Sequence, residues 1–113
     1  MLAYIKQARR SNTCLNCIKD ERFAEALAEA RAADLQLAAW RANAAGAELP
    51  PFHGVPISIK EVFAVRGMLQ TGGTFNRRET KAAIDATPVK RMREAGFIIT
   101  CVSCIPELGM FYA

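Results

Sequence analysis

The stretch Pro51–Glu61 most constrains the fold of this chain, because it joins a turn to a short apolar strand that ends in a lysine. Two prolines and a glycine within residues 50–54 predict a turn. Side chains of a strand alternate between its two faces, so Val55, Ile57 and Ile59 should share one face and Ser58 and Lys60 the other. Strands this apolar usually lie in a sheet that is covered on both faces.

Two interpretations of Lys60 are open at this point. A lysine inside a covered sheet loses solvent, which disfavours its charged form and makes it a usable base near neutral pH. The alternative is an ordinary lysine at a strand end, whose ammonium group reaches water. Spacing alone favours the ordinary lysine.

Length and composition restrict the class of protein. A chain of 113 residues is a single domain or part of one, and a hydrophobic fraction of 51% is sufficient for a core. The apolar runs are far shorter than the ~20 residues that a membrane-spanning helix needs, and the first residues lack the apolar region of a secretory signal. We therefore expect a cytoplasmic protein, or one that associates with a membrane on its cytosolic side.

The net charge of +4 comes from 15 basic and 11 acidic residues. A basic excess can indicate a nucleic-acid partner. Acidic residues are interleaved here, however, and no aromatic residues alternate with the arginines, so solvated helix faces explain the charge better and no nucleic-acid partner is expected. The basic groups are Arg9-Arg10, Arg77-Arg78 with Lys81, and Lys90-Arg91 with Arg93.

Four cysteines form the pairs Cys14/Cys17 and Cys101/Cys104, a spacing that suggests zinc. Residues 18–100 separate the pairs, far more than the ~15–20 residues of compact zinc ribbons. Cys101 and Cys104 also lie three apart in a predicted strand and should point to opposite faces. We therefore expect no metal site, and free, buried, reduced thiols.

The order of expected elements is helix, strand, loop, helix, strand, which is typical of an α/β protein with a mostly parallel sheet. The first half of the chain should hold a helix over residues 2–10 ended by Ser11-Asn12, a brief extended piece over 13–18, and a helix over 21–43 with Asp20 as N-cap and Gly46 beyond its end. The strand that ends at Lys60 follows. The second half should hold a helix from Asp85 or Thr87 to Ala95, with Pro88 in its first turn and Gly96 after it, and then a strand over 97–104.

Several ordered motifs resemble the amidase signature family. They are Gly54–Glu61, Gly67-Met68, Asp85-Ala86-Thr87, Gly96 and Pro106-Glu107-Leu108. The stretch Leu15–Ala30 is similar to the family's first long helix. Asn76-Arg77-Arg78 and residues 107–112 look most like fatty acid amide hydrolases of the second type. The resemblance covers nearly the whole chain.

The resemblance implies an α/β fold with a mixed, largely parallel sheet flanked by helices. It also implies hydrolysis of carbon–nitrogen amide bonds by a serine, a second serine with a cis peptide bond, and a lysine, with no cofactor. Lys60 stands at the position of the catalytic lysine. Gly109, Met110 and Tyr112 fall in the segment that contacts substrate, where Gly109 matches by position only. The implied partner is a small-molecule amide, with a lipid amide favoured.

The chain departs from the family pattern in three places. The family's two serines lie further downstream, whereas this chain contains only Ser11, Ser58 and Ser103. Cys101 and Cys104 replace the expected Gly and Asn. The chain also begins inside the family's first helix.

We therefore expect residues 1–113 to be the N-terminal portion of an amidase domain, truncated at both ends and inactive alone. Membrane association of a full-length form stays open, and the sequence does not predict an oligomeric state. The alternative function is a non-catalytic truncated paralogue that binds lipid amides or a protein.

Overall fold

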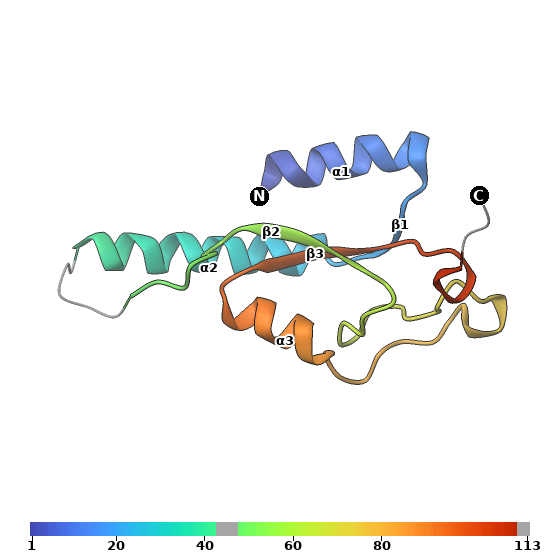
Figure 1. Cartoon of the computed structure of the whole chain (residues 1–113). Helices are drawn as coiled ribbons and strands as arrows, with labels where there is room; N and C mark the ends of the chain where they lie inside the picture. The colour runs from blue at the N-terminus through green and yellow to red at the C-terminus, as the bar shows by residue number, and fades with distance from the viewer. Residues whose placement is uncertain (43–47, 111–113) are drawn as a thin grey trace.

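The computed structural model describes residues 1–42 and 48–110, which fold as a mixed α/β arrangement around a three-stranded sheet (Figure 1). The strand order is β1-β3-β2, with β1 antiparallel and β2 parallel to the central β3. The elements in chain order are α1 (Leu2–Leu15), β1 (Ile18–Glu21), α2 (Phe23–Ala42), β2 (Pro56–Lys60), the 3₁₀ turn η1 (Phe75–Arg77), α3 (Thr87–Glu94), β3 (Ile98–Ser103) and the 3₁₀ turn η2 (Glu107–Gly109). The predicted α/β class is confirmed.

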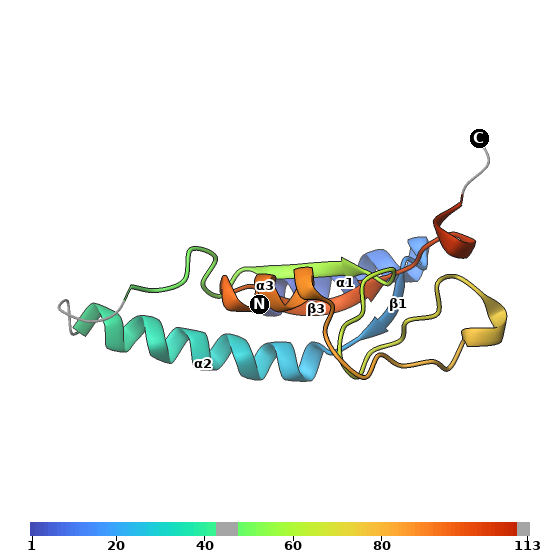
Figure 2. The ribbon, with the colours of Figure 1, turned by 60° about the horizontal axis from the view of Figure 1, so that its bottom comes forward.

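Helices lie on both sides of the sheet. In Figure 1, α1 lies above the strands and α3 below them, and the turned view of Figure 2 places α3 in front and α1 behind. The long α2 runs beside β3 and extends well past the sheet. None of the helices within residues 1–42 and 48–110 is long and apolar enough to cross a membrane.

Two apolar cores occupy the two faces of the sheet. The core on the α3 side is built from Ile59, Val65, Met68, Val89, Ile99 and Val102. A smaller core on the α1 side joins Ile5, Phe23 and Cys101. Strand β3 contributes to both cores and its first five residues are buried, which explains why its sequence is apolar without strict alternation.

Strand β3 contains an irregularity that decides which side chains share a face. Ile57 pairs with Ile99, whereas the next residue, Ser58, pairs with Cys101, so Thr100 is an extra residue on β3. The hydroxyl of Thr100 donates to the carbonyl of Ile57 at 3.0 Å. This bulge lets Ile99 and Val102, three residues apart, contribute to the same core.

The predicted turn before β2 is present and is held by the end of α3. The Phe52 and Gly54 amides donate to the carbonyls of Ala95 and Gly96, and the Phe52 and Phe97 rings stack 4.3 Å apart. Gly96 has φ +98, and a Cβ there would lie 2.9 Å from the His53 backbone, so a glycine is required.

Two predicted boundaries are wrong at the start of the chain, the end of the first helix and the start of the extended piece. Helix α1 does not end at Ser11-Asn12 but continues to Leu15, and Asn16 ends it with φ 45. The Asn12 side chain instead accepts a hydrogen bond from the Ile18 amide at 2.8 Å. Residues 13–15 are consequently helical rather than extended.

Asp20 is not the N-cap of α2, because Asp20 and Glu21 belong to β1. The Asp20 carboxylate accepts hydrogen bonds from the amides of Glu21 and Leu69 and so ties β1 to a distant loop. Helix α2 begins at Phe23, and its predicted end near Asn43 and Gly46 lies outside the described residues.

The second half of the chain follows the sequence predictions. Helix α3 begins at Thr87 with Pro88 in its first turn, and Gly96 follows its end. Strand β3 lies within the predicted range of 97–104.

Candidate active site at the carboxyl end of strand β2

Lys60 is the last residue of β2, and it is exposed together with Ser58. Strand β2 is an edge strand in the described sheet, and Lys60 at its carboxyl end is exposed on the sheet face that also carries Ser58. The expectation of a strand buried on both faces is therefore wrong for this end of β2. The predicted alternation of faces is confirmed for Ile59, which lies between Ser58 and Lys60 in the sequence and is buried in the core on the α3 side.

Ser103 stands opposite Lys60, which sequence reasoning missed. The two residues are Cα partners in the parallel pairing of β2 with β3, and the Glu61 amide donates to the Ser103 carbonyl at 3.1 Å. Carboxyl ends of parallel strands meet at one edge of a sheet, where α/β proteins bind ligands. The signal in the sequence was that both apolar strands end in a polar residue.

A cavity lies beneath α1 on the sheet face that carries Ser58 and Ser103. It encloses about 340 Å³ and its wall is mainly apolar. Its lining combines residues of α1, of the loop before β1, of the start of α2 and of all three strands: Tyr4, Ile5, Ala8, Ser11, Cys17, Ile18, Phe23, Pro56, Ile57, Ser58, Thr100, Cys101 and Ser103.

Glu61, the residue after Lys60, is a buried carboxylate that organises the adjoining loop. Its side chain accepts hydrogen bonds from the amide and hydroxyl of Thr71 at 3.1 and 2.8 Å, and from the Gly73 amide at 3.2 Å. Glu61 and Thr71 are 1% and 0% exposed. These bonds fix the Thr71–Thr74 loop against the end of β2.

The same loop reaches the segment expected to contact substrate. The Gly72 carbonyl accepts a hydrogen bond of 2.7 Å from the Leu108 amide. A Cβ on Gly73 would lie 2.7 Å from the carbonyl oxygen of Pro106, so this close approach requires glycine. In Figures 1 and 2, β2 runs toward the side of the molecule on which η2, drawn in red, lies.

Gly109 and Met110 are both exposed at that end, Gly109 with φ +75. The structure joins them to the neighbourhood of Lys60 through Glu61 and the 71–74 loop, although it shows no direct contact between Lys60 and either residue. Tyr112, the third predicted substrate residue, lies outside the described residues.

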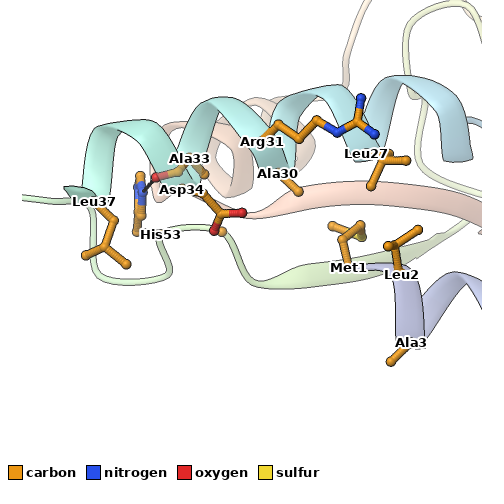
Figure 3. Close-up of a pocket in the computed structure, with 11 residues that line it drawn as sticks. Met1, Leu2, Ala3, Leu27, Ala30, Arg31, Ala33, Asp34, Leu37 and His53 are labelled. Atoms are coloured by element: carbon orange, nitrogen blue, oxygen red, sulfur yellow. Dashed lines mark hydrogen bonds between the residues drawn. The ribbon is translucent and has the colours of Figure 1, made fainter. Parts of the chain in front are cut away.

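A larger cavity of about 510 Å³ lies elsewhere, between the start of α1, the middle of α2 and the turn before β2 (Figure 3). His53 reaches into this region, and its Nε2 lies 2.9 Å from the Ala33 carbonyl oxygen. Arg31 and Asp34 belong to its lining, whereas Lys60 does not. The site at Lys60 is therefore separate from this cavity.

The cysteines differ from expectation in their burial. Only Cys101 is buried, whereas Cys14, Cys17 and Cys104 are exposed. Burial raises the pKa of the Cys101 thiol, and a hydrogen bond from Thr100 opposes this shift. Residues 1–42 and 48–110 contain no group of three or more His, Cys, Asp or Glu side chains placed to hold a metal ion.

Comparison with known proteins identifies the family to which this fold belongs. The profile of the Amidase family matches residues 1–113, so the chain belongs to that family. It is 40% identical to human fatty-acid amide hydrolase 2 over 111 residues, which cover 97% of this chain and 21% of that protein. It is 34% identical to the indoleacetamide hydrolase of Bradyrhizobium diazoefficiens over 107 residues, or 95% of this chain and 19% of that protein.

Solved structures give the same class. A protein in an inhibitor-bound vestigial complex related to the origins of an s-triazine catabolic enzyme superposes with a TM-score of 0.78 at 26% identity, covering 91% of this chain and 21% of that one. A substrate complex of 6-aminohexanoate cyclic dimer hydrolase gives a TM-score of 0.73 at 26% identity, covering 94% and 20%. The chain thus spans about a fifth of the length of its relatives.

Proposed function

We propose that this chain supplies the lysine base of an amide hydrolase, with Lys60 as that base. The observation that carries the proposal is the place of Lys60 at the carboxyl end of β2, beside the end of the parallel strand β3, in a chain of the Amidase family. Such strand ends are where α/β enzymes position catalytic groups.

The chemistry follows the serine–lysine form of nucleophile activation. Neutral Lys60 accepts the proton of the nucleophilic serine through a bridging serine, and later returns it to the leaving amine. Ser58 lies on the same strand as Lys60, two residues before it, so it cannot stand opposite Lys60 as the nucleophile. The proposal assigns the two serines of this scheme to polypeptide outside residues 1–113, as the resemblance to the amidase signature family implies, and gives no role in it to Ser103, the strand partner of Lys60.

Removal of Lys60 from solvent is the second requirement, because water stabilises the charged ammonium group. Lys60 is exposed here, and polypeptide that carries the two serines would also cover it. For this reason the proposal treats residues 1–113 as part of an amidase domain, and the 113-residue chain alone is expected to hydrolyse no amide.

The proposed substrate is a fatty-acid amide, which would contact Gly109, Met110 and Tyr112. Two observations support this class. Met110 is 58% exposed beside Leu108, which is 64% exposed, so apolar side chains are available at the same end as Lys60. Human fatty-acid amide hydrolase 2 shares 40% identity with the chain.

A chimeric enzyme tests the proposal. The matching stretch of human fatty-acid amide hydrolase 2 is replaced by residues 1–113, and ammonia release is measured from a long-chain fatty-acid amide and from acetamide. We expect turnover of the long-chain amide. Lys60→Ala should lower kcat by at least about 100-fold, the usual contribution of a positioned base.

Lys90→Ala is the matched control, because Lys90 is an exposed lysine on α3. It should leave turnover within about twofold of the parent chimera, since exposed substitutions away from a site have small effects. Retained activity in Lys60→Ala would contradict the role of Lys60. Turnover of acetamide but not of the long-chain amide would contradict the substrate class alone.

The second candidate function is a non-catalytic module that binds a lipid amide or a protein. The exposed apolar side chains near β2, Val55, Val62 and Phe63, favour it, because such surfaces often mark binding sites. A folded chimera without amide turnover, whose parent enzyme is active, would support this function over hydrolysis.

A further inference from the structure

The antiparallel pairing of β1 with β3 continues one step beyond the strands and brings two cysteines together. Ile18 is the Cα partner of Ser103. One step outward, Cys17 stands opposite Cys104, and the Cys104 amide donates to the Cys17 carbonyl at 2.8 Å. The two thiols are thus on opposed residues of adjacent segments, although residues 18–103 separate them in the sequence.

The spacing of opposed residues suits a disulfide. Opposed residues of an antiparallel pair have Cα atoms about 4.5–5.5 Å apart, within the range of about 4.4–6.8 Å that disulfides span. The Cys104 thiol also lies 3.6 Å from the carbonyl oxygen of Asn16, the residue directly before Cys17. The Cys104 side chain is therefore directed at the backbone that carries Cys17.

Both cysteines are free and exposed, so a soluble oxidant can reach them. We propose that Cys17 and Cys104 form a reversible thiol-modification site, a cross-strand disulfide made by exchange with a small disulfide such as oxidised glutathione. One thiolate attacks a glutathione sulfur and releases the first glutathione thiol. The second thiolate attacks the protein sulfur of the mixed disulfide and releases the second. Two protein thiols are oxidised and one glutathione disulfide is reduced to two thiols.

The other two cysteines are poorer partners for either residue. Cys101 is 4% exposed and pairs across the sheet with Glu21, which is four residues further along the chain than Cys17. Burial also raises the pKa of the Cys101 thiol and so reduces its reactive thiolate. Cys14 lies in the last turn of α1, and the left-handed Asn16 separates it from the extended backbone of Cys17.

The cross-link would fix the end of the sheet next to Lys60. Cys104 follows Ser103, the strand partner of Lys60, and Cys17 precedes β1. A disulfide between Cys17 and Cys104 would close a long loop and so restrict the conformations of the unfolded chain. We expect the apparent Tm to rise by on the order of 10 °C on oxidation. This inference does not depend on Lys60 being a base.

Peptide mapping tests the site in the 113-residue chain. The native chain is incubated with oxidised glutathione, remaining thiols are alkylated, and the digest is analysed by mass spectrometry without reduction. We expect one dominant cross-linked peptide pair, Cys17–Cys104, which dithiothreitol removes. The same treatment in urea should give mixed pairings, because only the folded chain opposes these two residues.

Variants separate this pair from the others. Cys17→Ser and Cys104→Ser should each abolish the intramolecular disulfide and the rise in Tm, whereas Cys14→Ser should change neither. A dominant Cys14–Cys17 or Cys17–Cys101 peptide in the native chain would overturn the proposal. The proposal would also be overturned if Cys17 and Cys104 of the native chain formed only mixed disulfides with glutathione. This outcome is measured on the unsubstituted chain, so it does not depend on whether a variant folds.

Discussion

At the scale of single residues, the end of β2 depends on the Glu61 carboxylate, which is 1% exposed and forms no ion pair within residues 1–42 and 48–110. Three donors bond to this carboxylate, namely the amides of Thr71 and Gly73 and the Thr71 hydroxyl. Hydrogen bonds to a charged acceptor are stronger than neutral ones, which offsets part of the cost of burying the charge. The position of the 71–74 loop therefore follows from Glu61.

Replacing Glu61 by alanine should destabilise the chain by about 3 kcal/mol, because it leaves the buried amide and hydroxyl of Thr71 without their acceptor and removes one of the two acceptors of the Gly73 amide. Glu61→Gln should cost less, since the amide oxygen can still accept from one of them. Urea denaturation at pH 7 measures both. Glu79→Ala, whose side chain is 86% exposed, is the control and should cost less than about 0.5 kcal/mol. Equal losses in all three variants would contradict this role of Glu61.

The buried thiol of Cys101 predicts a pH dependence of stability. Burial raises its pKa in the folded chain above the ordinary value of 9.0. The unfolded chain then releases this proton first, so the contribution of Cys101 is fully present below about pH 9 and is lost as the pH rises through the folded pKa. Cys101→Ala should weaken the fall in unfolding free energy between about pH 8 and pH 10, measured by urea denaturation. Cys14→Ala, which removes an exposed thiol, should leave that fall unchanged.

Sequence reasoning placed Lys60 at the end of its strand but did not find its neighbour. The alternation of apolar and polar residues located Lys60 relative to Ile59, which the structure confirms. The opposition of Lys60 and Ser103 depends on the bulge at Thr100, which shifts the register by one residue. No local pattern encodes a bulge of this kind, because the extra residue is as buried as its neighbours.

At the scale of elements, Arg22 joins β1, α2 and β3. Its amide donates to the Thr100 carbonyl at 3.0 Å, and its guanidinium donates to the Ile99 carbonyl at 2.7 Å and pairs with both oxygens of Glu29. The hydrogen bond with Glu29 raises the pKa of Arg22 above its ordinary value, so Arg22 stays charged. Arg22 thus fixes the start of α2 along the edge of β3.

Arg22→Ala should lower stability by about 1–3 kcal/mol, because it removes a charged hydrogen bond to a buried carbonyl and leaves Glu29 with only a distant partner, Arg93, at 3.9 Å. Arg22→Lys should restore only part of this loss, since a lysine lacks the planar fork that bonds both Glu29 oxygens in parallel. Thermal unfolding followed by circular dichroism measures the change. Arg31→Ala on the exposed surface of α2 is the control, and an equally large effect there would argue against Arg22 as the link.

The elements that the sequence predicted best are those whose local and tertiary preferences agree. Helix α3 has Pro88 in its first turn and Gly96 beyond its end, and both residues act locally. Strand β1 was missed because Lys19, Asp20 and Glu21 are typical of a helix start rather than a strand. Its pairing depends on β3, which lies near the other end of the chain, so tertiary contacts override the local preference.

At the scale of the whole molecule, the described chain is extended rather than compact. Its radius of gyration is 16.0 Å, against about 13 Å expected for a compact domain of this length. Helix α2 accounts for much of the difference, because it runs past the sheet and buries only Phe23 and Ala26. Trp40, near the far end of this helix, is 44% exposed.

The exposed apolar surface around β2 predicts concentration-dependent self-association of the 113-residue chain. Strand β2 is an edge strand, and the apolar side chains of Val55 and Val62 at its two ends are 42% and 51% exposed. Edge strands with adjacent apolar surface favour pairing with another chain.

Sedimentation velocity between about 1 and 100 μM should show a rising average mass. The double variant Val55→Lys/Val62→Lys should shift association to at least about tenfold higher concentration, because charges at an edge oppose pairing. Leu35→Lys, which alters an exposed apolar residue of α2 instead, should have little effect, so equal effects of both changes would place the contact away from β2. A monodisperse monomer throughout this range would show that the apolar surface around β2 does not drive association.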